Sequence, residues 1–233
     1  MHGNLSVMVK KIIAEKIYVY ESLIALFVTT LIVSNIASIK LVGEPPIVFD
    51  AGTLLFPLAY ILGDIITEVY GFKKMRRILL ISIVMLLMTT MMFWLVGLLP
   101  PNSEWGMQAS YEAILGTVWR IVAASVVAIF LGEMINAYVL AKLKVQTKGR
   151  GLWYRLIGSS TVGNAVDTSL FSIIAFAGTV SAGTLLSIIG TVYIIKMIAE
   201  IVLSPLTILI INRIKSSTGI DQYESPDLLH TKA

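Results

Sequence analysis

Hydrophobic residues occur along this chain in runs of about twenty, separated by short polar links. Because a helix of about 20 apolar residues spans the hydrocarbon core of a bilayer, the pattern predicts six membrane spans. They cover roughly residues 20–40, 51–71, 78–99, 118–141, 156–177 and 188–211. We therefore predict an all-α integral membrane protein, with a lead at 1–19, a six-helix domain at 20–212 and a polar tail at 213–233.

The links differ in character. The link at 40–50 contains Pro45-Pro46, which stops a helix and predicts a tight turn. The 142–155 loop is polar and basic, so Lys144 is expected to be a solvated loop charge. Lysine and arginine concentrate in the lead, the loop between spans 2 and 3, the 142–155 loop and the tail, which hold 15 of the 18. This bias predicts that both termini are cytoplasmic, in the plasma (inner) membrane.

Composition narrows the function. The chain is 57% hydrophobic and only 14% charged, against about 25% charged residues in soluble domains. Its net charge of +4 comes from the short loops, so it does not indicate nucleic-acid binding. There are no cysteines, and the two histidines lie near the chain ends, which excludes thiolate and histidine metal sites within the membrane. We expect no metal, cofactor or catalytic residue, and no phosphate-binding G-x-x-x-x-G-K-[ST] motif occurs.

The stretch 61–77 places two carboxylates, Asp64 and Glu68, one helical turn apart, just before a basic cluster. Ionised side chains within a span cost roughly 2.5 to 3.5 kcal/mol each, so they require partners or a polar cavity. Other spans supply polar residues at similar depth. We predict that a single cavity collects the candidate substrate-binding residues Asn35, Asp64, Glu68, Glu133, Asn164, Asp167, Tyr193, Lys196 and Glu200.

Each candidate also has a purely structural interpretation. Glu68 lies five residues before Lys73 and could face cytoplasmic water. Lys196 and Glu200 are one turn apart and could neutralise each other. Asn35, like Asn136, could simply make hydrogen bonds between helices. The glycines and small side chains early in the 156–177 span favour close helix packing.

Several of these residues give the chain a resemblance to a known family. They are Ser34-Asn35, the run from Gly52 to Phe56-Pro57 with Gly63-Asp64, then Gly163-Asn164 with Asp167-Thr168, and Tyr193 with Lys196 before Pro205. In these features the chain resembles the queuosine precursor transporter family, also called the VUT family of vitamin uptake transporters, over about residues 20 to 212.

The resemblance implies import of 7-deazaguanine bases, such as 7-cyano-7-deazaguanine, its aminomethyl form or queuine, for salvage into tRNA queuosine. It also implies a fold similar to the substrate-binding subunits of energy-coupling-factor transporters. The chemistry is compatible, because a carboxylate can accept both adjacent donors of a guanine-like edge. Lysine or asparagine can donate to its carbonyl oxygen, and an aromatic side chain can cover its ring.

Two other functions stay open at this point. The chain could be the binding subunit of an energy-coupling-factor transporter, which borrows an ATPase module, although we do not expect that partner. An intramembrane enzyme that uses Asp64 and Asp167 as an acid–base pair is less favoured, because no nucleophile or metal motif accompanies them. The expected partners are a purine-like small molecule and the lipid bilayer. Homo-oligomerisation and proton coupling are left open.

Overall fold

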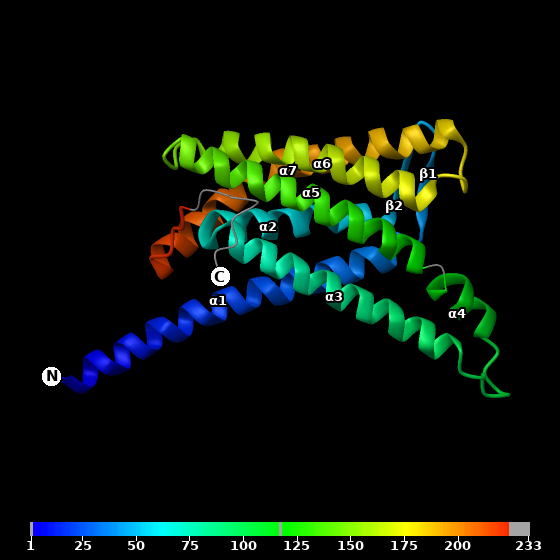
Figure 1. The fold of residues 1–233 in the computed structure, drawn as a ribbon, viewed down its shortest axis with the longest axis horizontal. Helices are drawn as coiled ribbons and strands as arrows, with labels where there is room; N and C mark the ends of the chain where they lie inside the picture. The colour runs from blue at the N-terminus through cyan, green and yellow to red at the C-terminus, as the bar shows by residue number, and fades with distance from the viewer. Residues whose placement is uncertain (1, 117, 224–233) are drawn as a thin grey trace.

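The computed structural model describes residues 2–116 and 118–223. Within them the chain forms seven α-helices, one 3-10 helix and a two-stranded sheet (Figure 1). In chain order these are α1 (His2–Ala37), β1 (Leu41–Glu44), β2 (Ile47–Asp50), the 3-10 helix Ala51–Leu54, α2 (Phe56–Tyr70), α3 (Phe72–Gly97), α4 (Gln108–Leu115), α5 (Val118–Gln146), α6 (Leu152–Phe176) and α7 (Ala182–Thr218).

Each predicted span corresponds to one helix: α1, α2, α3, α5, α6 and α7. Among the described residues, four segments are both long and apolar enough to cross a membrane: Ile17–Ala37, Phe72–Gly97, Gln108–Gln146 and Ala182–Thr218. Helix α2 has only 15 residues, about 22 Å of rise, and α6 is diluted by serine, threonine, asparagine and aspartate. The protein is therefore mostly helical and membrane-spanning, and it also contains a short helix, α2, and a more polar helix, α6.

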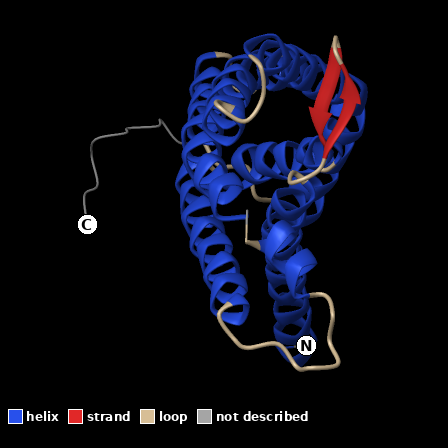
Figure 2. Ribbon diagram, turned by 90° about the vertical axis from the view of Figure 1, so that its right-hand side faces the viewer, coloured by secondary structure: helices blue, strands red, loops and turns tan. Residues whose placement is uncertain are grey.

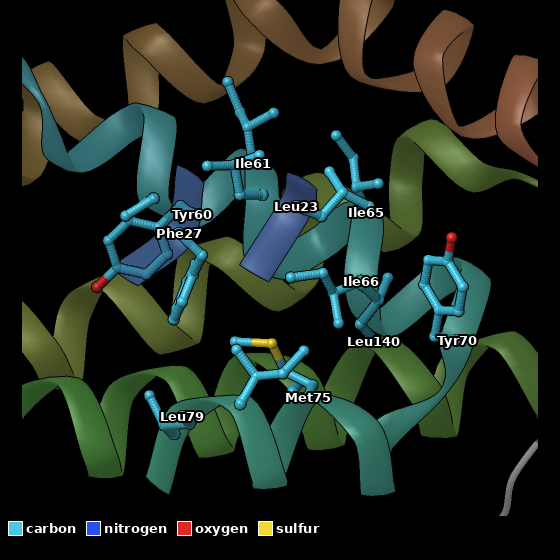
Figure 3. Packing of buried hydrophobic residues seen from close by; sticks show 14 of the residues in the cluster. Leu23, Phe27, Tyr60, Ile61, Ile65, Ile66, Tyr70, Met75, Leu79 and Leu140 are labelled. Carbon is cyan, nitrogen blue, oxygen red and sulfur yellow. The ribbon is translucent and has the colours of Figure 1, made fainter. Parts of the chain in front are cut away.

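Helix α2 lies at the centre of the fold, and nearly all its residues are buried. In Figure 3, Ile65 and Ile66 of α2 lie among Phe27 of α1, Met75 of α3 and Leu140 of α5. Because other helices surround α2, its backbone is shielded from lipid despite its short length.

The 40–50 link confirms the predicted tight turn but corrects the all-α prediction. It forms an antiparallel hairpin in which Glu44 pairs with Ile47 across a cis Pro45-Pro46 turn (Figure 2). Proline excludes a helix here, and the Ile-Val-Phe run after it favours a strand. Buried Asp50 ends the hairpin and accepts hydrogen bonds from Ser38 (2.6 Å) and Thr53 (2.9 Å).

Two helices lean away from the rest of the bundle. The N-terminal half of α1 and the C-terminal part of α3 diverge from α5, α6 and α7 in Figure 1. Helix α3 exposes large apolar side chains, among them Met88, Met91 and Trp94. An apolar face of this extent is typical of a helix that faces lipid.

The loops that carry the basic residues gather at one end. The α2–α3 junction, the α5–α6 loop and the C-terminal end of α7 lie there, opposite the hairpin, and α1 projects beyond them on the same side (Figure 1). We call this the basic end.

Candidate functional site

Charged and polar side chains from four helices meet inside the bundle. We call them the central cluster, and they are Asp64 of α2, Glu133 and Asn136 of α5, Asp167 of α6, and Lys196 and Glu200 of α7. All are at most 4% exposed. Five of the nine predicted site residues, Lys196 among them, therefore converge here, although they come from four helices that are far apart in the sequence.

Lys196 holds one side of the cluster. Its Nζ lies 2.5 Å from Oδ2 of Asp167. The same ammonium lies 4.8 Å from the ring centre of Phe56 and 5.2 Å from that of Tyr60, both on α2. Aromatic faces stabilise a cation at such distances, so the ion pair and the two rings fix the position of Lys196.

The carboxylates on the other side are less well paired. Asn136 donates to Oδ1 of Asp64 at 2.8 Å, and Glu200 and Glu133 both lie within electrostatic reach of Asp64. One oxygen of each of these three carboxylates is buried without a hydrogen-bond partner, and so is Oδ1 of Asn136. Unpaired buried acceptors are costly, so this side of the cluster is able to receive donors from a ligand.

The space beside the cluster is small. A cavity of about 10 Å³ is lined by Phe27, Phe56, Tyr60, Ile129 and Glu133, among others. Such a volume holds about one water molecule. The structure therefore shows a closed form of the site, in which the predicted substrate cavity is not open.

Glycines allow the charged residues to approach one another. A Cβ atom on Gly132 of α5 would overlap Asp167, and one on Gly163 of α6 would lie 2.6 Å from Cβ of Asn136. A Cβ on Gly63 of α2 would overlap the carboxylate of Glu133. The small residues thus serve helix packing, and the packing they permit builds the cluster.

We expect Gly132→Ala and Gly163→Ala each to destabilise the protein by about 1–3 kcal/mol, the usual range for an overfilled core. Melting temperatures of the purified variants in detergent would measure this. Gly190→Ala is the matched control, because a Cβ at Gly190 of α7 meets no atom within 4 Å. Equal melting temperatures for all three variants would contradict the close approach of α5 and α6.

Three other predicted site residues have different surroundings. Asn35 is fully buried but donates to the carbonyl of Leu31 in its own helix. Asn164 lies 3.7 Å from the sulfur of Met197, and Tyr193 of α7 is half-buried. The oxygens of Asn35 and Asn164 have no partner, so both amides keep an acceptor available.

Glu68 belongs to a separate group at the basic end. Its carboxylate is fully buried and forms a bidentate ion pair with Arg155 of α6. The two guanidinium nitrogens lie 2.5 and 3.2 Å from the two carboxylate oxygens. Lys215 of α7 lies 2.7 Å away and Lys144 of α5 3.6 Å away. We call these four residues with Asp221 the Glu68 network. It joins α2, α5, α6 and α7, and it removes the alternative in which Glu68 faces water.

The segment after α7 completes this network. Asp221 contacts Lys144 at 2.6 Å and Lys215 at 2.9 Å, and Gln222 donates its backbone N–H to Val69 of α2. Partial burial disfavours the charge of Asp221, but the two ammonium groups outweigh that effect and lower its pKa. Its ion pairs are therefore present at neutral pH and are lost as the pH falls through that lowered pKa.

Two sequence-based interpretations are corrected here. Lys144 is not a solvated loop charge: it is 2% exposed and donates to backbone carbonyls of Glu68 and Gln222. Lys196 pairs with Asp167 rather than with Glu200. Asp50 was not among the predicted site residues. Its hydrogen-bond partners Ser38 and Thr53 come close to it only when the hairpin forms.

Comparisons with known proteins agree with this picture. The family described as "Putative vitamin uptake transporter" matches residues 50–210, which include every member of the central cluster. A "Probable queuosine precursor transporter" of Bacillus subtilis (strain 168) is 26% identical over 173 residues, covering 74% of this chain and 76% of that protein. No solved structure matches the chain, so the similarity to energy-coupling-factor subunits stays a prediction. The family match spans well over half of the chain, which belongs to the vitamin uptake transporter family.

Proposed function

We propose that this protein imports queuosine precursors, 7-deazaguanine bases, across the plasma membrane and binds them at the central cluster. The observation that carries the proposal is the central cluster, in which four carboxylates and one lysine are buried together inside a transporter-family protein. The lysine also lies close to the aromatic rings of Phe56 and Tyr60. The named function of the Bacillus subtilis relative supports the choice of substrate.

The unpaired acceptors suit the edge of such a base. A deazaguanine presents N1–H and a 2-amino group side by side, and one carboxylate can accept from both. Asp64 and Glu133 each keep a free oxygen for this role. Lys196 can donate to the carbonyl oxygen of the base, and Phe56 and Tyr60 offer faces against which its ring can stack.

The closed form implies a movement during transport. A base is larger than the single water that the cavity of about 10 Å³ can hold, so the helices around the cluster must separate to admit it. The Glu68 network ties four helices together at the basic end. We assign Glu68 to closing this end, rather than to contact with the substrate.

Uptake can be tested in a host that cannot synthesise the precursor. We expect queuosine in its tRNA only when both this gene and external precursor are supplied, and less of it with the Asp167→Asn variant at matched amounts of folded protein. Queuosine that appears equally without the gene would overturn the proposal. Uptake by the purified protein in proteoliposomes would separate a transporter working alone from a subunit that needs an ATPase partner.

The proposal includes six spans with both termini cytoplasmic. Reporter fusions after residues 46, 108 and 181 should then report the outside, and fusions after residues 75, 148 and 218 the inside. The reason is the concentration of lysine and arginine in the loops of the basic end. An outside signal at residue 148 would reverse the topology, because that loop carries the most positive charge.

A further inference from the structure

A second, larger hollow lies at the basic end, apart from the central cluster. It measures about 950 Å³ and is bounded by α1, the α2–α3 junction and the segment after α7. Its lining includes Tyr20 of α1, Tyr70 at the end of α2, and Lys74 and Arg77 of α3. We call it the basal groove.

The basal groove is positively charged. Its exposed charge comes from Lys74 and Arg77, and Glu21 is the single acidic residue in the described part of its lining. The two acidic residues of the Glu68 network do not offset the positive charge of the groove. Glu68 is already paired with Arg155 and Lys215, and Asp221 contacts Lys144 and Lys215.

Aromatic rings position one of these cations. Lys74 lies 4.9 Å from the ring centre of Tyr20, and the rings of Tyr20 and Tyr70 lie 4.7 Å apart. Lys74 and Arg77 nevertheless stay exposed. Both side chains therefore present positive charge to the groove. The ring of Tyr20 stabilises the position of Lys74.

The remaining lining is apolar apart from Gln222. Ile17 and Ile24 of α1 and Ile220 after α7 complete the walls, and Ile17 is 49% exposed beside Tyr18, which is 69% exposed. Exposed apolar side chains at the end of a membrane-spanning segment face the acyl region of the bilayer. A ligand that matches both parts carries an anionic head and a hydrocarbon tail.

We propose that the basal groove binds the phosphate headgroup of an anionic membrane phospholipid. Basic pockets between membrane helices on the cytoplasmic side are able to hold such headgroups. The lipid would bridge α1, which leans away from the bundle, and the α2–α3 junction next to the Glu68 network.

The test uses the full-length protein, purified in uncharged maltoside detergent and titrated with phosphatidylglycerol or phosphatidylcholine. Native mass spectrometry would count the bound lipids. We expect phosphatidylglycerol to bind at least about tenfold more tightly than phosphatidylcholine, given the exposed cations Lys74 and Arg77 in the groove. Equal binding of the two lipids would overturn the proposal.

Charge removal gives the matched comparison. Lys74→Gln with Arg77→Gln should weaken phosphatidylglycerol binding roughly 10- to 30-fold. Lys142→Gln with Arg150→Gln removes the same charge from exposed positions of the neighbouring loop region and should leave binding unchanged. An equal loss in both double variants would show unspecific attraction and overturn the site.

Competition with inorganic phosphate and a single-residue variant provide two further tests. Inorganic phosphate at millimolar concentration should not displace the lipid, and full displacement would assign the groove to a soluble anion instead. If the double variant is not monodisperse, Lys74→Gln alone should weaken binding about fivefold, and unchanged binding in that variant would also reject the proposal.

Discussion

Replacing Glu68 by glutamine is expected to destabilise the protein by about 3–5 kcal/mol, the usual effect of removing one partner from a buried ion pair. The carboxylate is fully buried against Arg155 and Lys144, each 2% exposed, and Lys215 adds a third cation. Glutamine keeps the shape but leaves three positive charges, for which Asp221 is the single acidic partner in the part of the chain that the structure describes. Thermal unfolding in detergent would measure the loss.

Glu104→Gln is the control for this experiment. Glu104 is an exposed acid in the link between α3 and α4, where loss of one charge has little effect on stability. If both variants melted at the wild-type temperature, the Glu68 network would not hold the basic end together. If Glu68→Gln lost stability but transported faster per folded molecule, the network would be confirmed as a barrier to opening.

The hydrophobic pattern was sufficient to predict helices because a run of about 20 apolar residues is long enough to cross a bilayer as a helix. It placed α3, α5 and α6 to within six residues at either end. Helix α1, however, begins at His2 rather than near residue 20, and α7 covers Ala182–Thr218 rather than 188–211. It placed α2 less well, because the start of a buried helix depends on neighbouring helices. The span was predicted from residue 51, and the helix begins at Phe56, after a 3-10 turn.

The candidate site shows the same division between local and tertiary information. Depth alone marked Asp64, Asp167 and Lys196 as residues in need of partners, and the structure brings them into one cluster. Sequence spacing could not tell that Lys196 would choose Asp167, which is 29 positions away, over Glu200, which is four away. Nor could the polar character of the 142–155 loop reveal that Lys144 would be buried beneath the segment after α7.

The second large effect is expected at Lys196. In the described part of the cluster it is the single cation, and it pairs with Asp167, so Lys196→Met leaves that buried carboxylate without its partner. We expect a loss of about 3–5 kcal/mol and little folded protein. Lys142→Met, at an exposed position of α5, removes a positive charge that water already solvates and should fold normally. Detergent-solubilised monodisperse protein would be compared at matched expression.

Asp167→Asn should behave differently, because Glu133 still lies within electrostatic reach of Lys196. This variant should fold but bind the precursor more weakly, since a lost hydrogen bond to a charged group costs about 1.5–3 kcal/mol, or roughly 10- to 150-fold in affinity. Adding Asp167→Asn to Lys196→Met should recover part of the lost stability, because it removes one uncompensated carboxylate. If the double variant were no more stable than Lys196→Met, the 2.5 Å contact would not be the interaction that holds the lysine. Unchanged binding and stability in Asp167→Asn would remove Asp167 from both the site and the ion pair.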